Sequence, residues 1–273
     1  MPPPLPASRE GRGVMVTEGQ TIVVWFSCGA ASAVAAKKTI EKYGNFCTVR
    51  IVNNPVMEEH EDNRRFLKDV EKWLGVEIEI AINDKFPSMS AVDVWNAKKG
   101  MSFPKGAPCT VHLKKQARYD YESRVKIDWH VLGFTSEEAH RHKNFVFGER
   151  SNTLPILIDA GYTKADCFQI LAEAGITPPI IYSLGYPNAN CIGCVKATSP
   201  TYWNHVRKVH PVVFAERAEQ SRRLGAKLVR VKGKRIQLDE LDPAAQGRSM
   251  KNLSAPECGI FCKTPDLFKK ETP

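Results

Sequence analysis

Five of the eight cysteines lie in three separate segments whose spacing could support metal or sulfur chemistry. The closest pair is Cys191 and Cys194, and two cysteines with two residues between them present both sulfurs to one metal ion. Cys109 lies in a second segment, and Cys258 and Cys262 lie in a third. One pair cannot complete a zinc or iron–sulfur site, so we expect distant segments to supply further ligands. A redox pair is the alternative for Cys191 and Cys194, but no thioredoxin-like pattern surrounds them.

Cys47 and Cys167 have a simpler interpretation. Cys47 falls in a strand pattern and Cys167 in a helix pattern, where an unmodified cysteine behaves as a small hydrophobic residue. We expect both to belong to the core.

A turn made of small residues follows the first apolar run, at 22–26. The run is β-branched and aromatic and predicts a buried strand. A tight turn of this kind that leads into a helix directs backbone N–H groups at an anion, and small side chains let a phosphate approach. An ordinary strand-to-helix turn is the alternative. The candidate nucleotide-binding residues of this turn are Ser27, Cys28, Gly29, Ala30, Ala31 and Ser32.

Strand and helix patterns alternate along most of the chain. Thr163, with Asp166 three residues later and Gly175 at the end, marks one capped helix, and Thr135 with Glu138 marks the start of another. The predicted strands are 22–26, 46–52, 76–82 and 129–134, and the predicted helices are 30–38, 58–74 and 163–174.

This alternation predicts an α/β fold with a mostly parallel sheet of five or six strands and helices on both faces. We expect residues 1–19 to be a disordered extension, because they are rich in Pro, Gly and charge. Residues 20–200 then form a nucleotide-binding α/β domain. Residues 201–273 form a C-terminal appendage with a basic hairpin around Lys232-Gly233-Lys234 and a cysteine-containing tail.

Composition limits the classes of protein that fit. Hydrophobic residues make up 42% of the chain and charged residues 25%, which supports a substantial core. The net charge of +9 suits either a polyanionic partner or a basic, soluble surface. No apolar run reaches the length of a membrane helix, and the proline-rich start lacks the apolar region of a signal peptide. We therefore expect a cytoplasmic protein without membrane contact, whose cysteines are thiols or metal ligands.

Two charged clusters have competing interpretations. The acidic run Glu58, Glu59, Glu61 and Asp62 is most simply a solvated helix start, where acidic residues suit the helix dipole. The basic stretch could contact nucleic acid, but it lacks aromatic residues for base stacking, which favours an ordinary charged surface. Its members are Arg222, Arg223, Lys227, Arg230, Lys232, Lys234 and Arg235.

The segment from Phe26 to Ser32 resembles the PP-loop of the adenine-nucleotide α-hydrolases and the sulfonucleotide reductases. The resemblance implies an adenine nucleotide α-hydrolase-like fold that binds phosphoadenylyl sulfate (PAPS), adenylyl sulfate (APS) or ATP. Ala31 stands where the ATP-cleaving members carry an aspartate for Mg²⁺-pyrophosphate chemistry. The reductase branch often lacks that aspartate, so this difference favours the PAPS/APS reductase-like family.

The cysteine segments are similar to those of the same reductases. Cys191 lies 82 positions after Cys109, and Lys114 falls on the family's basic position. The resemblance implies a [4Fe–4S] cluster held by Cys109, Cys191 and Cys194, with Thr110 replacing one family cysteine. Cys262 is the first candidate for the fourth ligand, and an open iron site is the alternative.

The end of the chain and the stretch after residue 132 continue the resemblance. Glu257-Cys258-Gly259-Ile260 matches the motif whose cysteine is the family's nucleophile, with Phe261 where a histidine is expected. The match implies that Cys258 attacks the sulfur of activated sulfate. Cys258 and Cys262 as a pair of metal ligands is the alternative. Arg141 matches a residue that contacts the substrate's phosphate end.

Three hypotheses follow. The first is a sulfonucleotide reductase-like enzyme that forms sulfite and an adenine nucleotide, with a thioredoxin-like reductant and no flavin or nicotinamide. The second is an ATP-dependent enzyme that transfers sulfur to tRNA or DNA, which the basic stretch favours and Ala31 opposes. The third is a nucleotide- or nucleic-acid-binding module that zinc stabilises through Cys109, Cys191, Cys194 and Cys262. The sequence does not determine the oligomeric state.

Overall fold

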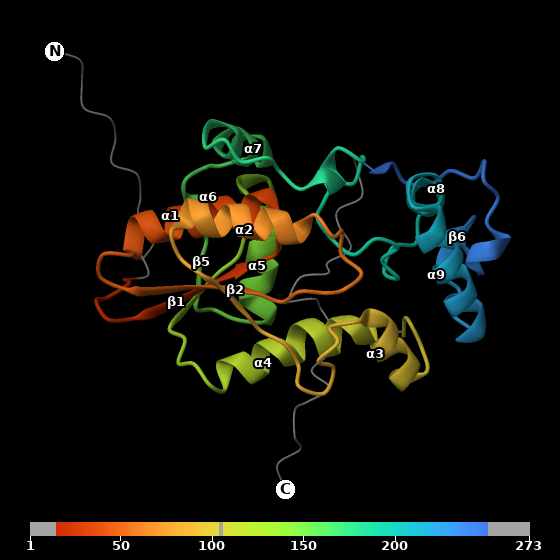
Figure 1. Ribbon diagram of the computed structural model, residues 1–273, viewed down its shortest axis with the longest axis horizontal. Helices are drawn as coiled ribbons and strands as arrows, with labels where there is room; N and C mark the ends of the chain where they lie inside the picture. Colours follow the sequence, from red (N-terminus) through yellow and green to blue (C-terminus); the bar gives the residue numbers. More distant parts are fainter. Residues whose placement is uncertain (1–14, 104–105, 251–273) are drawn as a thin grey trace, which may run out of the picture.

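The computed structural model describes residues 15–103 and 106–250, and its centre is a five-stranded parallel sheet (Figure 1). The strand order is β3-β2-β1-β4-β5, and every neighbouring pair is parallel. This arrangement confirms the predicted α/β fold with a mostly parallel sheet. The strands are β1 (Thr21–Phe26), β2 (Thr48–Asn53), β3 (Ile78–Ile80), β4 (Trp129–Val131) and β5 (Thr153–Leu154).

Helices cover both faces of the sheet, so the central strand β1 is buried on both sides. Along β1, Ile22, Val24 and Phe26 belong to one hydrophobic cluster, whereas Val23 and Trp25 belong to another. The first face packs against four helices, and the second receives side chains from α4 and α5. The four helices are α1 (Ala30–Tyr43), α2 (Asn63–Leu74), α6 (Ile156–Asp159) and α7 (Lys164–Glu173), and the other two are α4 (Ala117–Glu122) and α5 (Ala139–Gly148).

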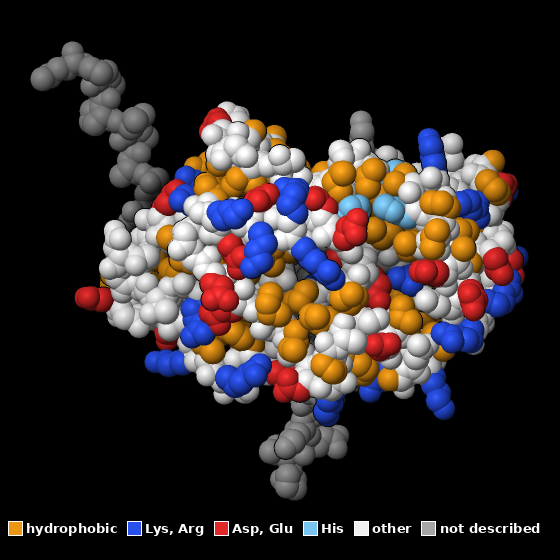
Figure 2. Space-filling model, viewed as in Figure 1, with side chains coloured by type: hydrophobic (Ala, Val, Ile, Leu, Met, Phe, Trp, Pro, Cys, Tyr) orange, Lys and Arg blue, Asp and Glu red, His pale blue; other side chains and the backbone are white. Residues whose placement is uncertain are grey.

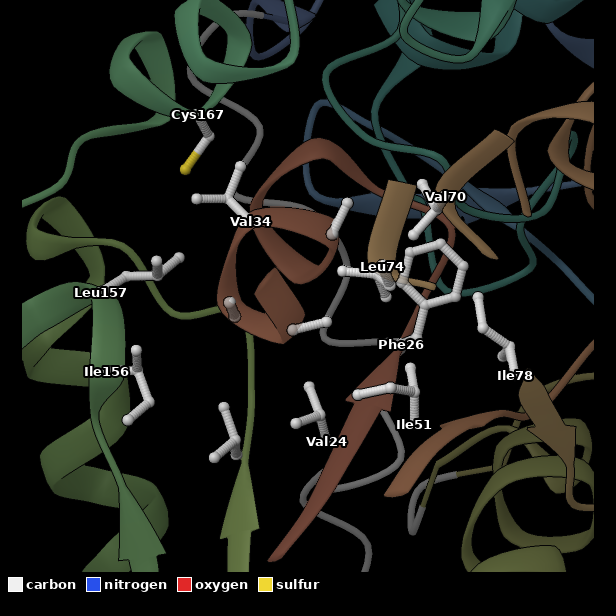
Figure 3. Packing of buried hydrophobic residues seen from close by; sticks show 14 of the residues in the cluster. Val24, Phe26, Val34, Ile51, Val70, Leu74, Ile78, Ile156, Leu157 and Cys167 are labelled. Carbon is white, nitrogen blue, oxygen red and sulfur yellow. The ribbon is translucent and has the colours of Figure 1, made fainter. Parts of the chain in front are cut away.

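The packing of the first face follows from side-chain size and spacing. Small residues of α1 are fully buried, which lets this helix lie close to the sheet. On α2, Phe66, Val70 and Leu74 recur every four residues and form one apolar face. Figure 3 shows the side chains of Val24 and Phe26 from the sheet packing among those of α1 and α2.

A third hydrophobic cluster forms a second lobe beside the sheet domain. It surrounds the fully buried Trp203 and includes residues from 91–113, 181–197 and 202–241. This cluster therefore crosses residue 200, where the sequence analysis placed a domain boundary. The lobe's elements are α3 (Ala91–Lys98), α8 (Pro200–Val209), α9 (Pro211–Arg223), β6 (Val229–Val231), β7 (Lys234–Ile236) and the 3₁₀ turns η3 (Ile180–Tyr182) and η4 (Leu238–Glu240).

Several local predictions are confirmed and others need correction. Thr163 caps α7 through Asp166, and β6 and β7 form the predicted antiparallel hairpin. Thr135 and Glu138 form a capping box, but they open the 3₁₀ turn η2 (Ser136–Glu138) that precedes α5. The helix predicted from residue 58 begins only at Asn63, because residues 54–62 form a loop with side chains bound elsewhere.

The described part of the predicted N-terminal extension contacts the domain. Val16 packs against the first cluster, and Gly19 donates a backbone hydrogen bond to the carbonyl of Phe46 at 2.9 Å. Residues 15–19 are therefore joined to the sheet domain. Within the described ranges, no helix combines the length and the apolar character needed to cross a membrane.

Candidate functional site

The small-residue turn lies at the C-terminal end of β1, where the sheet topology changes direction. The chain passes from β1 to β2 and β3 on one side, and β4 and β5 lie on the other side. In open α/β sheets, ligands bind at such a switch point, outside the carboxyl ends of the strands. Residues 27–32 and the residues that follow β4 therefore meet where a ligand is expected.

Hydrogen bonds to the Ser32 hydroxyl fix the shape of this turn. Ser32 Oγ accepts from the backbone N–H of Ser27 at 3.1 Å and lies 3.3 Å from that of Gly29. It donates to the carbonyl oxygen of Gly29 at 2.9 Å. Helix α1 then begins at Ala30, with no acidic residue in its first turn. The positive end of the α1 dipole is thus not neutralised by a local carboxylate, which suits an anion.

Gly133, in the loop after β4, touches the backbone of this turn. A Cβ atom at Gly133 would lie 2.7 Å from the backbone nitrogen of Ser32 and 2.9 Å from its Cα. Because these atoms belong to the backbone at the start of α1, they cannot move aside cheaply. Gly133 therefore allows the loop after β4 to approach the candidate nucleotide-binding turn.

Cys28 shapes the turn rather than acting as a nucleophile. Its backbone has φ of 54°, in the left-handed region that favours glycine. The Sγ atom is buried and lies 3.6 Å from Nδ2 of Asn53, which donates to it. Burial, followed by the charge of Glu59, raises the pKa of this thiol well above its usual value. Cys28 is therefore a neutral thiol at physiological pH.

Lys114 lies close to Cys28 but is held by protein groups. Its ammonium donates to the carbonyl of Asn54 at 2.7 Å and to Oε1 of Glu59 at 3.1 Å. The side chains of Lys114 and Glu59 are only 11% and 12% exposed. Burial raises the pKa of the Cys28 thiol, and the charge of Lys114 acts against this larger effect by lowering it. Nucleotide binding by Lys114 stays a prediction.

The acidic run is not the solvated helix start that the sequence suggested. Glu58 accepts hydrogen bonds from the first backbone N–H groups of α3, including Ala91 at 2.8 Å. Glu59 pairs with Lys114, and Asp62 forms an ion pair with Arg65 at 2.6 Å. The sequence did not show the partners of Glu58 and Glu59, because these lie on distant segments. Arg65, by contrast, is only three residues after Asp62.

Tyr182 is a residue of the turn's surroundings that the sequence analysis missed. Its hydroxyl accepts from the backbone N–H of Ala30 at 3.4 Å, at the start of α1. The ammonium of Lys164 lies 5.3 Å from the centre of its ring. Burial raises the pKa of Tyr182 to about 12, so the phenol stays protonated. Nothing in the pattern around residue 182 indicated that this residue reaches the turn.

Arg141 lies at the beginning of α5, beyond the loop that follows β4. Its guanidinium pairs with the carboxylate of Glu138 and lies 5.3 Å from the centre of the Phe134 ring. The structure thus places Arg141 in the chain segment that begins with Gly133, at the carboxyl edge of the sheet. A role in phosphate contact stays a prediction.

Cys109, Cys191 and Cys194 all contribute to the hydrophobic cluster of the second lobe. Cys109 directly precedes the π-helical turn η1 (Thr110–Gln116), which carries Lys114. The hydroxyl of Tyr202 accepts from the backbone N–H of Cys194 at 2.9 Å and donates to the carbonyl of Cys191 at 3.5 Å. Tyr202 therefore holds the loop between the two cysteines in shape.

The predicted metal centre is only partly within the described residues. Thiolate donors at the edge of an apolar cluster suit zinc or an iron–sulfur cluster by their chemistry. In residues 15–103 and 106–250, however, no three or more His, Cys, Asp or Glu residues form a group that could hold a metal ion. Cys258 and Cys262 lie outside the described residues. The metal centre stays a prediction.

One loop connects the candidate segments. This segment, residues 53–59, begins at the last residue of β2 and is called the β2 loop below. Through Asn53 it binds Cys28, and through Asn54 and Glu59 it binds Lys114. The carbonyl of Glu58 accepts from the backbone N–H of Ile192, between the two cysteines, at 2.8 Å. The β2 loop therefore joins the candidate nucleotide-binding turn, η1 and the Cys191–Cys194 loop.

The chain's own topology defines its class: a parallel α/β fold with a small-residue turn at the switch point of the sheet. No protein-family model matches the chain, and no curated protein matches it. Among solved structures, the chain is similar to the phosphoadenylyl-sulfate (PAPS) reductase from Candida auris, solved as a phosphate complex. That comparison has a TM-score of 0.46 at 11% identity and covers 62% of this chain and 80% of the other.

Gly133→Ala tests the contact between the β4 loop and the turn. We expect a loss of about 1–3 kcal/mol in unfolding free energy from overpacking, together with weaker adenine-nucleotide binding. Urea denaturation and thermal shift with nucleotide measure the two effects. Gly148→Ala is the matched control, because nothing lies within 4 Å of its added Cβ. Equal behaviour of the two variants would show that the contact at Gly133 is unimportant.

The Lys114–Glu59 pair can be tested with a double-mutant cycle. Lys114→Met or Glu59→Gln alone should cost about 3–5 kcal/mol, because each leaves the other charge buried without its partner. The double variant should cost clearly less than the sum of the two, as measured by urea denaturation. The more exposed pair Lys38–Glu41, whose side chains are 31% and 46% exposed, serves as control and should contribute less than about 1 kcal/mol. Additive losses at residues 59 and 114 would contradict the coupling.

Proposed function

We propose that this protein is a sulfonucleotide reductase-like enzyme that binds PAPS or APS and reduces its activated sulfate to sulfite. The observation that carries the proposal is the β2 loop. It contacts the nucleotide-binding turn at Cys28, η1 at Lys114 and the Cys191–Cys194 loop at Ile192. Nucleotide binding and cysteine chemistry can therefore take place in neighbouring parts of one molecule.

In this proposal the nucleotide phosphate binds at residues 27–32. Backbone N–H groups at the start of α1 and the hydroxyls of Ser27 and Ser32 supply donors. Ala31 supplies no carboxylate for a magnesium ion, which fits an enzyme that holds its nucleotide without cleaving the α-phosphate. Lys114 and Arg141 are the proposed side-chain contacts to the nucleotide, and in the structure they pair with Glu59 and Glu138.

The pKa values of the described thiols support a nucleophile in the C-terminal tail. Burial raises the pKa of Cys28, of Cys47 and of Cys167, the last to about 11. Thiols with raised pKa values make poor nucleophiles near neutral pH, because the thiolate is the reactive form. With Cys109, Cys191 and Cys194 assigned as ligands, Cys258 is the proposed nucleophile.

The proposed reaction balances with two thiols as the reductant. The Cys258 thiolate forms a bond to the sulfur of the activated sulfate, and the sulfur–oxygen bond to the nucleotide phosphate breaks. The adenine nucleotide leaves with the electron pair of that bond. A thioredoxin-like dithiol then attacks Sγ of Cys258 and releases sulfite, and its second thiol resolves the mixed disulfide. The dithiol is oxidised by two electrons and the sulfur is reduced by two.

Cys109, Cys191, Cys194 and Cys262 are the proposed ligands of a [4Fe–4S] cluster. Such a cluster would supply a redox-capable inorganic centre, whereas zinc at the same ligands would supply only a structural link. The ligand loop itself is positioned by Tyr202 and by Glu58, whichever metal is bound.

Anaerobic purification with Cys258→Ser tests the proposal. We expect a brown protein whose colour survives this substitution, while sulfite formation from PAPS or APS falls by more than about a thousandfold. Cys47→Ser is the matched control and should keep both colour and activity. Sulfite release that is undiminished in Cys258→Ser would remove the assignment. A colourless protein with one zinc ion per chain would favour the zinc-stabilised binding module.

A second candidate function is ATP-dependent sulfur transfer to tRNA or DNA. The observation that favours it is an exposed basic surface on the second lobe, formed by Lys227, Arg230, Lys232 and Lys234. Such a surface suits a phosphate backbone. This function requires pyrophosphate release from ATP that nucleic acid stimulates and that Arg230→Glu/Lys234→Glu abolishes. Lys42→Glu/Lys68→Glu, on α1 and α2, is the charge-matched control. Absence of release with any nucleic acid would exclude it.

A further inference from the structure

A cluster of histidines with one tyrosine lies outside the proposed nucleotide and cysteine sites. The ring centres of His60 and His210 are 6.0 Å apart, and that of Tyr186 is 5.7 Å from His210 and 4.7 Å from His205. Figure 2 shows histidine side chains gathered on one face of the molecule among hydrophobic side chains. His60 lies in the loop before α2, and Tyr186 lies in the segment after η3. His205 belongs to α8, and His210 directly follows that helix.

Two polar atoms of this cluster are buried without a hydrogen-bond partner among the described residues. They are the hydroxyl oxygen of Tyr186 and Nε2 of His210. Tyr186 is only 6% exposed, so water does not readily solvate its hydroxyl. A buried polar group without a partner is costly, and in native proteins it usually marks a bound water, an ion or a ligand. The Tyr186 hydroxyl is therefore an available donor, and Nε2 of His210 donates in the tautomer that carries its proton there.

Helix α9 begins at the same place. His210 precedes its first residue, Pro211, and makes no side-chain cap. The first turn of this 13-residue helix contains no acidic residue, so its free N–H groups and the positive end of its dipole are not neutralised there. The N-terminus of a helix as long as α9 suits an anion. The unpartnered hydroxyl of Tyr186, whose ring lies beside the cap residue His210, also suits an anion.

The hydrogen bonds of the remaining groups set their roles. His60 Nδ1 accepts from the backbone N–H of Asp62 at 3.1 Å, which leaves the ring proton on Nε2 as a donor. His205 Nε2 is bound to the carbonyl of Leu184 at 2.9 Å and so positions the tyrosine ring. The nearby carboxylates of Glu59 and Asp62 are paired with Lys114 and Arg65. The cluster thus offers the donors of Tyr186 and His60. Glu59 and Asp62 are neutralised by cations, and Glu61, the residue after His60, is exposed to solvent.

From this geometry we infer a second oxyanion site, for a phosphate group, formed by Tyr186, His210, His60 and the N-terminus of α9. A metal ion fits less well, because the described residues contain no group of three or more ligating side chains. The site is separate from residues 27–32. The ring of Tyr186 packs against that of Tyr202, with ring centres 6.2 Å apart, and the Tyr202 hydroxyl binds the backbone of Cys194. The site is therefore close to the Cys191–Cys194 loop.

Isothermal titration of the full chain with inorganic phosphate tests this site. Tyr186→Phe should weaken phosphate binding about tenfold or more, because it removes a hydrogen bond to a charged group. Without phosphate its melting temperature should be unchanged or higher, because an unpartnered buried hydroxyl has been removed. A purely structural tyrosine would instead lose stability on this substitution. His210→Gln is the second variant and should weaken phosphate binding without unfolding the chain.

Two controls separate this site from the nucleotide-binding turn. Ser32→Ala should leave this phosphate binding intact, and so should His140→Gln, which removes an exposed histidine on α5. Titration with AMP distinguishes a free phosphate from the phosphate of a nucleotide, since AMP binding at the turn depends on Ser32. Phosphate binding that is unchanged in both Tyr186→Phe and His210→Gln would overturn the inference. Phosphate binding lost in Ser32→Ala, or a response to zinc alone, would also overturn it.

Discussion

The buried ion pair between Lys114 and Glu59 is the interaction on which the arrangement of the candidate site depends. Removing an ammonium group from water is costly unless close partners replace its hydration. Lys114 satisfies this need with Glu59 and the carbonyl of Asn54. The pair therefore fixes η1, and Cys109 at its start, against the β2 loop. The same loop binds Cys28 and Ile192. The Lys114–Glu59 pair therefore helps to hold the turn after β1, η1 and the Cys191–Cys194 loop in place around the β2 loop.

Close packing at the carboxyl edge of the sheet supplies the second constraint. Small residues in the turn after β1 and at Gly133 bring the β1 and β4 loops into backbone contact. The loops after β1 and β4 can approach each other because both leave the sheet at its switch point. Tyr182 then covers the start of α1 from the second lobe. The site is thus built from the sheet domain and the second lobe together rather than from the sheet domain alone.

Much of the sheet domain could be predicted because its signals are local. The apolar run before Ser27, the apolar face of α2 and the Thr163 cap each act within one element. The acidic run shows the opposite case. Its composition equally fits a solvated helix start, and its actual role depends on Lys114, Arg65 and the first turn of α3. Tyr182 gave no signal, since its contact with the start of α1 joins segments distant in sequence. Helix α8 is also missing from the predicted helices, although Tyr202, Trp203 and Val206 recur at helical spacing.

The sequence by itself determined the parallel α/β class, the turn after the first strand and the cysteine spacing. These features follow from side-chain period, size and type along short stretches of chain. Only the tertiary structure decided that Lys114 is buried against Glu59, that Cys28 is a neutral thiol, and that Tyr186 stands beside the start of α9. Such properties depend on desolvation and on charges contributed by other segments, and neither exists until the chain has folded.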